Sequence, residues 1–357
     1  MRFVPANCLR EGMELAKPLY GRNNELLLAY GMLLNQNYIN GIKKLQYPGV
    51  YINDDISRDI EVVNVISDNL RNETINGIKK IFVKAENGVN QTAKESDIKN
   101  QIGSIVDELL ENRGMMVNMI DLRCFDNYTY SHSVNVAVFS IIMGIAMGLN
   151  KEELVKLGLG ALMHDIGKVF VDKNILNKPG KLTDEEFEEI KSHPGKGYLY
   201  VKEKFNLPSH SNRAIQDHHE KYDGTGYPNG RKQDEISLYG RIIAVADVYD
   251  ALTSERPYRK AVNPSESMEY IMSGAGTLFD SSVVHMFMHK IAPYPVGTMI
   301  QLSNEWVGIV VENYESFCLR PTVRIIRQNG SDIEPFEVTL KDDPKFRNVT
   351  VKGIEGQ

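Results

Sequence analysis

A long stretch of helical periodicity, from Ile102 to about Ile291, constrains the fold of this chain most strongly. Apolar residues recur there at the spacing of one helix face. Thr183 to Glu186 forms a capping box and Asn150 can cap another helix, so both mark helix starts. Helices are predicted near residues 102–120, 128–148, 151–166, 183–204, 210–220, 237–253, 264–273 and 281–291. Eight helices with short connections predict an all-α domain.

The flanking segments have a different character. Residues 1–55 predict a small α+β module, with a hairpin, a helix near 37–45 and a strand at 50–52. Residues 56–101 are polar and weakly helical, which indicates a helical connector or a dimerisation helix. Residues 292–357 carry β-branched runs separated by turns, and they predict a small β-barrel or sandwich. The predicted fold class is therefore multidomain, with an all-α domain at 102–291 between an α+β module and an all-β module.

Charge and composition limit the ligands. A net charge of −6 gives no global basic surface, which argues against a nucleic-acid polymer but allows a small anionic ligand. The cysteines Cys8, Cys124 and Cys318 are far apart and odd in number, which indicates reduced thiols. The most apolar segment, 134–149, is shorter than the about 20 residues of a membrane span and predicts a buried helix. With no apolar leader at Met1, we expect a cytoplasmic protein without a membrane anchor.

The segment from Ala161 to Lys168 carries the strongest chemical signal. His164 and Asp165 are adjacent, and imidazole with carboxylate suits Fe, Mn, Zn or Ni better than Ca or Mg. The two oxygens of Asp165 could bridge two metals. Lys168 lies one helical turn away, where a cation would suit an anionic substrate such as a phosphodiester. The alternative is an ordinary buried His-Asp hydrogen bond beside a surface lysine.

Other histidines and aspartates fall on successive predicted helices. Asp247 follows an apolar run, so its carboxylate is expected to be buried and to need a cation. Either Asp247 or His132 alone could be a satisfied polar group of the core. Coincidence explains the whole set poorly. The candidate metal ligands are His132, His164, Asp165, His193, His218, His219 and Asp247, whereas His210, His285 and His289 are expected on the surface or in packing.

The segment from about 110 to 290 resembles the HD-GYP family, a bacterial branch of the HD metal-dependent phosphohydrolases. The matching motifs are His132, His164-Asp165-Ile166-Gly167-Lys168, His193-Pro194, His218-His219-Glu220 with Gly226-Tyr227-Pro228, Asp247 to Ser254, and Arg256-Pro257-Tyr258-Arg259. The terminal modules resemble accessory modules of some members less specifically. The resemblance implies a cytoplasmic phosphodiesterase that hydrolyses cyclic di-GMP to pGpG, with attack by a metal-bridging hydroxide.

The resemblance also implies roles for individual residues. His132, His164, Asp165 and Asp247 would hold one metal, and Asp165 would bridge to a second metal held by His193, His218 and His219. Lys168 would bind the scissile phosphate, so Lys168 and Asp165 are the candidate catalytic residues. Tyr227, Arg256, Arg259 and Asp250 are candidates on the substrate side, although Asp250 could instead support a helix or a metal-binding histidine.

The resemblance leaves several points open. Fe or Mn is the expected metal, and Ni, Co or Zn also fit the ligands. Some members have a glutamate four residues before the first histidine that helps bind a third metal; this chain has Tyr128 there, which favours two metals and leaves cleavage on to GMP in doubt. Cyclic GMP-AMP is an alternative substrate. A cyclic di-GMP sensor that does not hydrolyse its ligand is an alternative function. The expected partners are GGDEF-type cyclases, docked through Gly226-Tyr227-Pro228, and a second copy of the chain in a homodimer.

Overall fold

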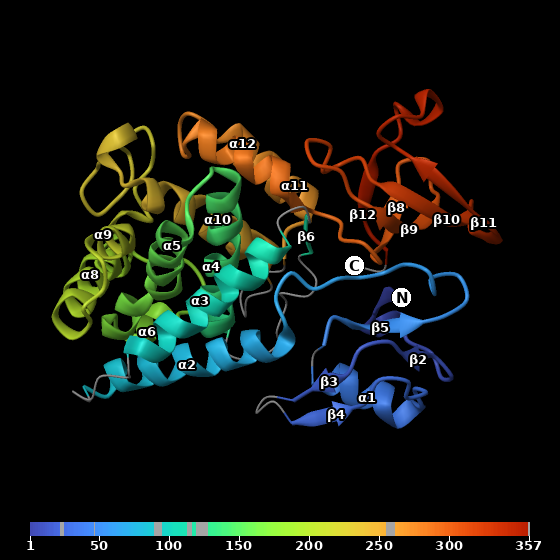
Figure 1. The fold of residues 1–357 in the computed structure, drawn as a ribbon, viewed down its shortest axis with the longest axis horizontal. Helices are drawn as coiled ribbons and strands as arrows, with labels where there is room; N and C mark the ends of the chain where they lie inside the picture. The colour runs from blue at the N-terminus through green and yellow to red at the C-terminus, as the bar shows by residue number, and fades with distance from the viewer. Residues whose placement is uncertain are drawn as a thin grey trace. The chain divides into compact units, whose positions relative to one another are not determined.

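The computed structural model describes residues 1–21, 25–45, 47–88, 95–112, 116–118, 128–254 and 261–355. Contacts divide the chain into two compact units, whose elements are labelled in Figure 1. The helical unit comprises Val65–Met115 and Tyr128–Phe287. The terminal unit comprises Met1–Asn64, Met116–Asn127 and Met288–Gln357, so both ends of the chain contribute to it.

The helical unit is built around α4 (Tyr128–Ala146), which packs against α5 (Lys151–Met163) and α10 (Leu238–Thr253). A helix that is apolar on every side belongs in a core, and residues from Val134 to Met143 are at most 6% exposed. Thr129–Ala146 has the length and hydropathy of a membrane span, but 78% of that window is buried inside the protein. The prediction of a buried core helix is therefore confirmed for this segment.

The remaining helices surround this centre. α9 packs against α5, α8 and α10, and α8 packs against η3. The elements of this unit are α2 (Asp68–Glu86), α3 (Glu95–Glu111), η3 (Ile166–Phe170), α6 (Lys173–Leu176), α7 (Asp184–Lys191), α8 (His193–Lys204), α9 (Ser209–Asp217), η4 (Gln233–Glu235), α11 (Pro264–Ser273) and α12 (Ser281–Lys290). Within the described residues, all named elements of this unit are helices, as predicted for the central segment.

Two predicted helices break where the sequence gives a local reason. The helix expected over 183–204 is split into α7 and α8 at Ser192, just before Pro194, whose ring cannot donate a backbone hydrogen bond. The helix expected over 151–166 ends at Met163 and continues as the tighter turn η3. Both interruptions occur beside candidate ligands, so they set the direction of those side chains.

Helix α2 differs from the expected connector. It is 19 residues long, and one face of it is buried, including Arg71, Thr74 and Ile78. It packs against α3, α4 and η3. Its polar composition made it look solvated, but the buried residues recur at helical spacing and cover the core of the helical unit.

The terminal unit contains two main antiparallel sheets. One has the order β1-β5-β2 and the other the order β11-β10-β9-β8-β12, while β3 and β4 form a hairpin. The elements are β1 (Arg2–Pro5), η1 (Ala6–Cys8), β2 (Glu14–Leu15), β3 (Leu19–Tyr20), β4 (Leu26–Leu28), α1 (Gln36–Lys44), β5 (Gly49–Asn53), β6 (Val117–Asn118), β7 (Ile291–Ala292), β8 (Met299–Leu302), β9 (Val307–Glu312), β10 (Thr322–Gln328), β11 (Ser331–Thr339), η5 (Pro344–Phe346) and β12 (Val351–Ile354).

The two ends of the chain form one body, whereas the sequence suggested separate modules. The N–H of Phe3 donates to the carbonyl of Gly297 at 2.8 Å. Arg324 on β10 pairs with Asp59 at 2.6 Å, and Ile60 packs in one apolar cluster with β8 and β9. β11 and β12 are the edges of the five-stranded sheet, which therefore does not close into the expected barrel through pairing of its described strands.

Gly167 provides a test of the packing between η3 and α8. A Cβ there would lie 1.9 Å from the backbone oxygen of His193 and 2.6 Å from the backbone nitrogen of Gly197. We expect Gly167→Ala to lower the free energy of unfolding by about 1–3 kcal/mol, because backbone atoms cannot move aside cheaply. Urea unfolding followed by circular dichroism measures this loss.

Gly195 on α8 is the matched control, since a Cβ there meets no atom within 4 Å. Gly195→Ala should leave stability unchanged or raise it by up to about 1 kcal/mol, because alanine favours a helix. Equal stabilities for the two variants would contradict the close contact between η3 and α8.

Candidate metal centre

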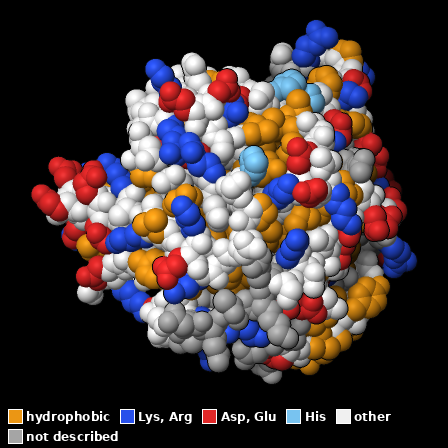
Figure 2. Space-filling model, turned by 60° about the vertical axis from the view of Figure 1, so that its left-hand side comes forward, with side chains coloured by type: hydrophobic (Ala, Val, Ile, Leu, Met, Phe, Trp, Pro, Cys, Tyr) orange, Lys and Arg blue, Asp and Glu red, His pale blue; other side chains and the backbone are white. Residues whose placement is uncertain are grey.

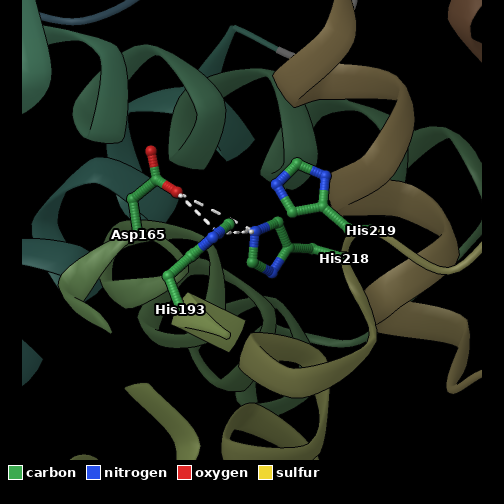
Figure 3. Close-up of side chains that lie close together, drawn as sticks. All are labelled: Asp165, His193, His218 and His219. Atoms are coloured by element: carbon green, nitrogen blue, oxygen red, sulfur yellow. Dashed lines mark hydrogen bonds and ion pairs between the residues drawn. The ribbon is translucent and has the colours of Figure 1, made fainter. Parts of the chain in front are cut away.

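The candidate ligands converge inside the helical unit. His132 projects from α4, His164 and Asp165 follow α5, His193 begins α8, His218 and His219 follow α9, and Asp247 lies on α10. Their ligand atoms form two groups, each with all atoms within 4.8 Å of one another: Asp165 with His193, His218 and His219, and His132 with His164 and Asp247. Figure 3 shows the first group, in which Asp165, His193 and the consecutive pair His218-His219 come together from three segments of the chain.

Asp165 lies between the two groups. Its Oδ1 is 3.4 Å from Nε2 of His193 and 3.9 Å from Nε2 of His218. Its Oδ2 is 3.4 Å from Nε2 of His164 and 3.9 Å from Nε2 of His132. Each oxygen therefore faces a different group, as a carboxylate bridging two ions requires.

Asp247 also faces both groups. Its Oδ1 is 3.1 Å from Nε2 of His132 and 4.0 Å from Nε2 of His164, and its Oδ2 is 4.0 Å from Nδ1 of His219. The resemblance had assigned Asp247 only to the metal held by His132 and His164. The geometry places its second oxygen beside His219 of the other group.

Helix ends orient three of the histidines. Each donates from Nδ1 to the backbone carbonyl three residues earlier: His164 to Ala161 at 2.7 Å, His193 to Ile190 at 2.7 Å and His218 to Ile215 at 2.8 Å. Carbonyls in the last turn of a helix lack helical partners. Because a carbonyl can only accept, Nδ1 carries the proton and Nε2 presents a lone pair to an ion. Sequence reasoning missed this device, although His164 and His218 lie near predicted helix ends and Pro194 marks a helix break beside His193.

Asp250 supports the fourth histidine. It is 1% exposed, and its Oδ2 accepts from Nδ1 of His132 at 2.6 Å. The expectation that Asp250 lies on the substrate side is therefore wrong, because the carboxylate is buried behind the histidine ring. The alternative, support of a metal-binding histidine, agrees with this position.

The buried charges fit a cation-binding role. Burial acts to raise the pKa of Asp165, but the charge of Lys168 and the interactions with His164 and His193 outweigh it and hold the pKa well below its usual range. Burial lowers the pKa of His219 to about 3, so that its imidazole is neutral. Burial opposes protonation of His132 too, but Asp247 and Asp250 outweigh it and raise that pKa to about 9. A metal at His132 would replace this proton.

Two buried ligand atoms of the groups support binding of a metal. His164 Nε2 and Asp165 Oδ1 are buried and make no hydrogen bond with the described residues. A buried polar atom without a partner costs about 1–3 kcal/mol. Divalent ions between these atoms would satisfy both, and the nitrogen and oxygen donors suit Fe, Mn, Co, Ni or Zn. The residues therefore fit a pair of transition-metal ions.

Lys168 and Tyr227 border the ligands. The ammonium of Lys168 donates to Asp165 Oδ2 at 2.5 Å, while its side chain remains 28% exposed. The ring of Tyr227 stacks on His219 with centroids 4.8 Å apart. Arg256, Arg259 and the side chain of Tyr128 lie outside the described residues. On the face drawn in Figure 2, histidine and hydrophobic side chains reach the surface with Lys and Arg side chains on either side.

Two acidic residues beside the His218-His219 pair position the loop that bears Tyr227. Glu220 is 3% exposed and accepts from the backbone N–H groups of Asn229 and Arg231 at 2.8 and 3.0 Å. Asp217 is fully buried and pairs with Arg213 and Arg231. Sequence reasoning gave neither residue a role, although acidic residues on both sides of a histidine pair were visible.

The fold and the site define a helical domain with paired His/Asp metal groups. Residues 114–283 match the family model described as the HD domain. The chain is 38% identical to the cyclic di-GMP phosphodiesterase PA4108 of Pseudomonas aeruginosa over 234 aligned residues. The alignment covers 66% of this chain and 56% of that protein. It is 39% identical over 155 residues to the 3'3'-cGAMP-specific phosphodiesterase 3 of Vibrio cholerae, covering 43% of this chain and 33% of that protein.

Among solved structures, the HDG"Y"P protein Bd1817 of Bdellovibrio bacteriovorus has a similar fold, with a TM-score of 0.53 at 18% identity over 80% of this chain and 97% of that one. This chain thus spans about half of the length of PA4108 and a third of that of the Vibrio protein. The predicted resemblance to the HD-GYP phosphodiesterases is confirmed.

Single ligand changes should separate the two metal positions. We expect wild-type protein to hold two equivalents of Mn²⁺ or Fe²⁺, and His132→Ala and His193→Ala each to lose one, because each removes a ligand from a different group. Asp165→Ala should weaken both positions, since its oxygens face both groups. Elemental analysis of anaerobically purified protein measures the content.

His210→Gln is the control, because His210 is an exposed histidine on α9 outside both groups. It should keep both equivalents. Retention of two equivalents by His132→Ala and His193→Ala alike would contradict the assignment of ligands.

Proposed function

We propose that this protein is a metal-dependent phosphodiesterase that hydrolyses cyclic di-GMP to pGpG. The observation that carries this proposal is the position of Asp165 between the two histidine groups, with the ammonium of Lys168 on the same carboxylate. Two cations held close together and a nearby lysine are what cleavage of an anionic diester needs.

The negative charge of the substrate explains the separate roles of the metals and Lys168. A phosphodiester repels an anionic nucleophile, and a pair of bound divalent metals would lower the pKa of water and neutralise phosphoryl oxygens. The seven side chains would hold these ions away from bulk water, since six of them are buried and His219 is partly so. Lys168 spans from Asp165 to the exposed edge, where its ammonium can stabilise negative charge on the substrate phosphate.

Residues at the edge would bind the bases. Tyr227 presents a ring beside His219, and burial raises the pKa of its phenol, so the hydroxyl remains a neutral hydrogen-bond donor. We propose that Arg256 and Arg259 bind phosphate or guanine edges, a role that suits the planar guanidinium.

Relatives support the choice of substrate. PA4108 is named a cyclic di-GMP phosphodiesterase, and the Vibrio cholerae relative is named 3'3'-cGAMP-specific. Cyclic di-GMP is our first candidate, and cyclic GMP-AMP is the second because of that Vibrio relative. Both substrates have the same phosphodiester backbone, so the metal site serves either one.

Further features complete the proposal. Fe or Mn would fill the two positions, with Ni, Co or Zn as compatible ions, and Tyr128 in place of a glutamate favours two metals over three. The protein would act in the cytoplasm. GGDEF-type cyclases that dock on Gly226-Tyr227-Pro228 and a second copy of this chain are the proposed macromolecular partners.

Replacement of Lys168 tests the catalytic arrangement. With Mn²⁺- or Fe²⁺-loaded protein we expect pGpG from cyclic di-GMP, detected by chromatography, and no product after chelation. Lys168→Met should lower kcat by about 10²–10³-fold, as loss of one transition-state charge contact does, while metal content stays at the wild-type level.

Lys191→Met is a matched control. Lys191 is also 28% exposed and pairs with a carboxylate three residues away, Glu188, at 2.6 Å, but outside the metal groups. It should keep wild-type kcat. Faster turnover of cyclic GMP-AMP would select the second substrate, whereas tight binding of cyclic di-GMP without product would make this protein a sensor instead.

A further inference from the structure

A buried chain of hydrogen bonds joins α2 to the metal groups. Arg71 on α2 donates from Nη2 to Asn135 Oδ1 at 3.0 Å. Asn135 on α4 donates from Nδ2 to Asp250 Oδ1 at 2.8 Å, and the other oxygen of Asp250 accepts from His132 Nδ1 at 2.6 Å. All of these side chains are at most 5% exposed. We call this chain the Arg71 relay.

The chemistry of Arg71 fixes the direction of the whole relay. A guanidinium only donates, so Asn135 must turn its oxygen toward Arg71 and its amide nitrogen toward Asp250. An ionised carboxylate only accepts, so the proton between Asp250 and His132 lies on Nδ1. Nε2 of His132 then faces Asp247 and Asp165, at 3.1 and 3.9 Å, where an ion would take the place of its proton.

Reversal of any one link would disturb the histidine. An Asn135 amide turned the other way would bring its NH₂ to Arg71, where donor meets donor, and its oxygen to Asp250, where acceptor meets acceptor. Buried polar groups mispaired in this way cost about 1–3 kcal/mol each. The relay therefore selects one amide orientation and one direction of the His132 ring.

Arg71 lies outside the part of the chain that matches the HD domain, which begins at residue 114. α2 nevertheless packs against α4, which carries His132, and against η3, which carries Lys168. A buried guanidinium is costly unless it is hydrogen-bonded, and simple packing of α2 would be served by an apolar residue. The guanidinium of Arg71 thus lies on the face of α2 that packs against the elements carrying the site residues.

We propose that Arg71 is a positioning residue for the metal centre, which through Asn135 and Asp250 holds His132 with Nε2 toward the ion. This inference rests on the proposed metal-dependent function. It extends the functional unit to a helix that precedes the HD domain and that the sequence indicated only as a connector or dimerisation helix.

Metal affinity tests the relay without any turnover. Mn²⁺ is titrated into chelator-treated full-length protein, and free Mn²⁺ is followed by electron paramagnetic resonance. Outer hydrogen-bond partners of metal-binding histidines contribute about 10–100-fold in affinity. We expect about 10-fold weaker binding at one of the two Mn²⁺ positions for Asn135→Leu and about 3–10-fold for Arg71→Met, which is one link further from the ion.

Three further variants separate positioning from packing. Arg71→Lys keeps a donor for Asn135 and should bind Mn²⁺ more tightly than Arg71→Met. Arg71→Met with Asn135→Leu should bind no more weakly than Asn135→Leu alone, because both changes break one pathway. Ile78→Val removes one methyl group from the same buried face of α2; it should lower the melting temperature but leave Mn²⁺ affinity unchanged.

The outcomes that overturn the proposal are distinct from failure of the proposed function. Wild-type affinity in Arg71→Met overturns the relay, as does additive loss in the double variant. Equal weakening by Ile78→Val and Arg71→Met at matched stability assigns the effect to packing and also overturns it. Wild-type protein that binds no Mn²⁺ or Fe²⁺ would remove the metal centre itself, and the relay with it; metal binding without hydrolysis would refute only the proposed activity.

Discussion

The structure depends on one buried carboxylate placed between two sets of imidazoles. Asp165 is 2% exposed and directs one oxygen to each histidine group. A charge in that position is tolerable only if cations surround it. Lys168 supplies one positive charge, and the geometry leaves room for metal ions to supply the others. The helices that converge on Asp165 are therefore held to a common point by electrostatics as well as by apolar packing.

Helix ends give this centre its precision. His164, His193 and His218 all lie where a helix has just ended, and each donates to a carbonyl in the last turn of that helix. The backbone thus sets the tautomer and the direction of the ring, and no second side chain is needed to orient it. The end of α5 and the break between α7 and α8 place these rings, so the interruptions in helical periodicity are part of the site.

His132 is oriented differently, because it lies within α4 and its neighbouring carbonyls are used by the helix. Its support comes from side chains instead: Asp250 on α10, Asn135 on α4 and Arg71 on α2. This arrangement links the segment that matches the HD domain to a helix that precedes it in the chain. The helical unit is consequently larger than the segment that matches the family, and α2 belongs to its core.

The sequence alone predicted most helices and the candidate ligands, because residue type and helical spacing are local properties: His132, the His164-Asp165 pair and Asp247 were identifiable as candidates without coordinates. It left Asp250 open between substrate binding and support of a helix or a histidine, and it could not direct the second oxygen of Asp247, bury α2 or join the two ends of the chain in one unit. Those features depend on contacts between residues far apart in sequence, such as Arg71 with Asn135 and Phe3 with Gly297. Only the packing of complete helices and sheets decides which distant polar groups meet, and therefore which way a buried side chain must point.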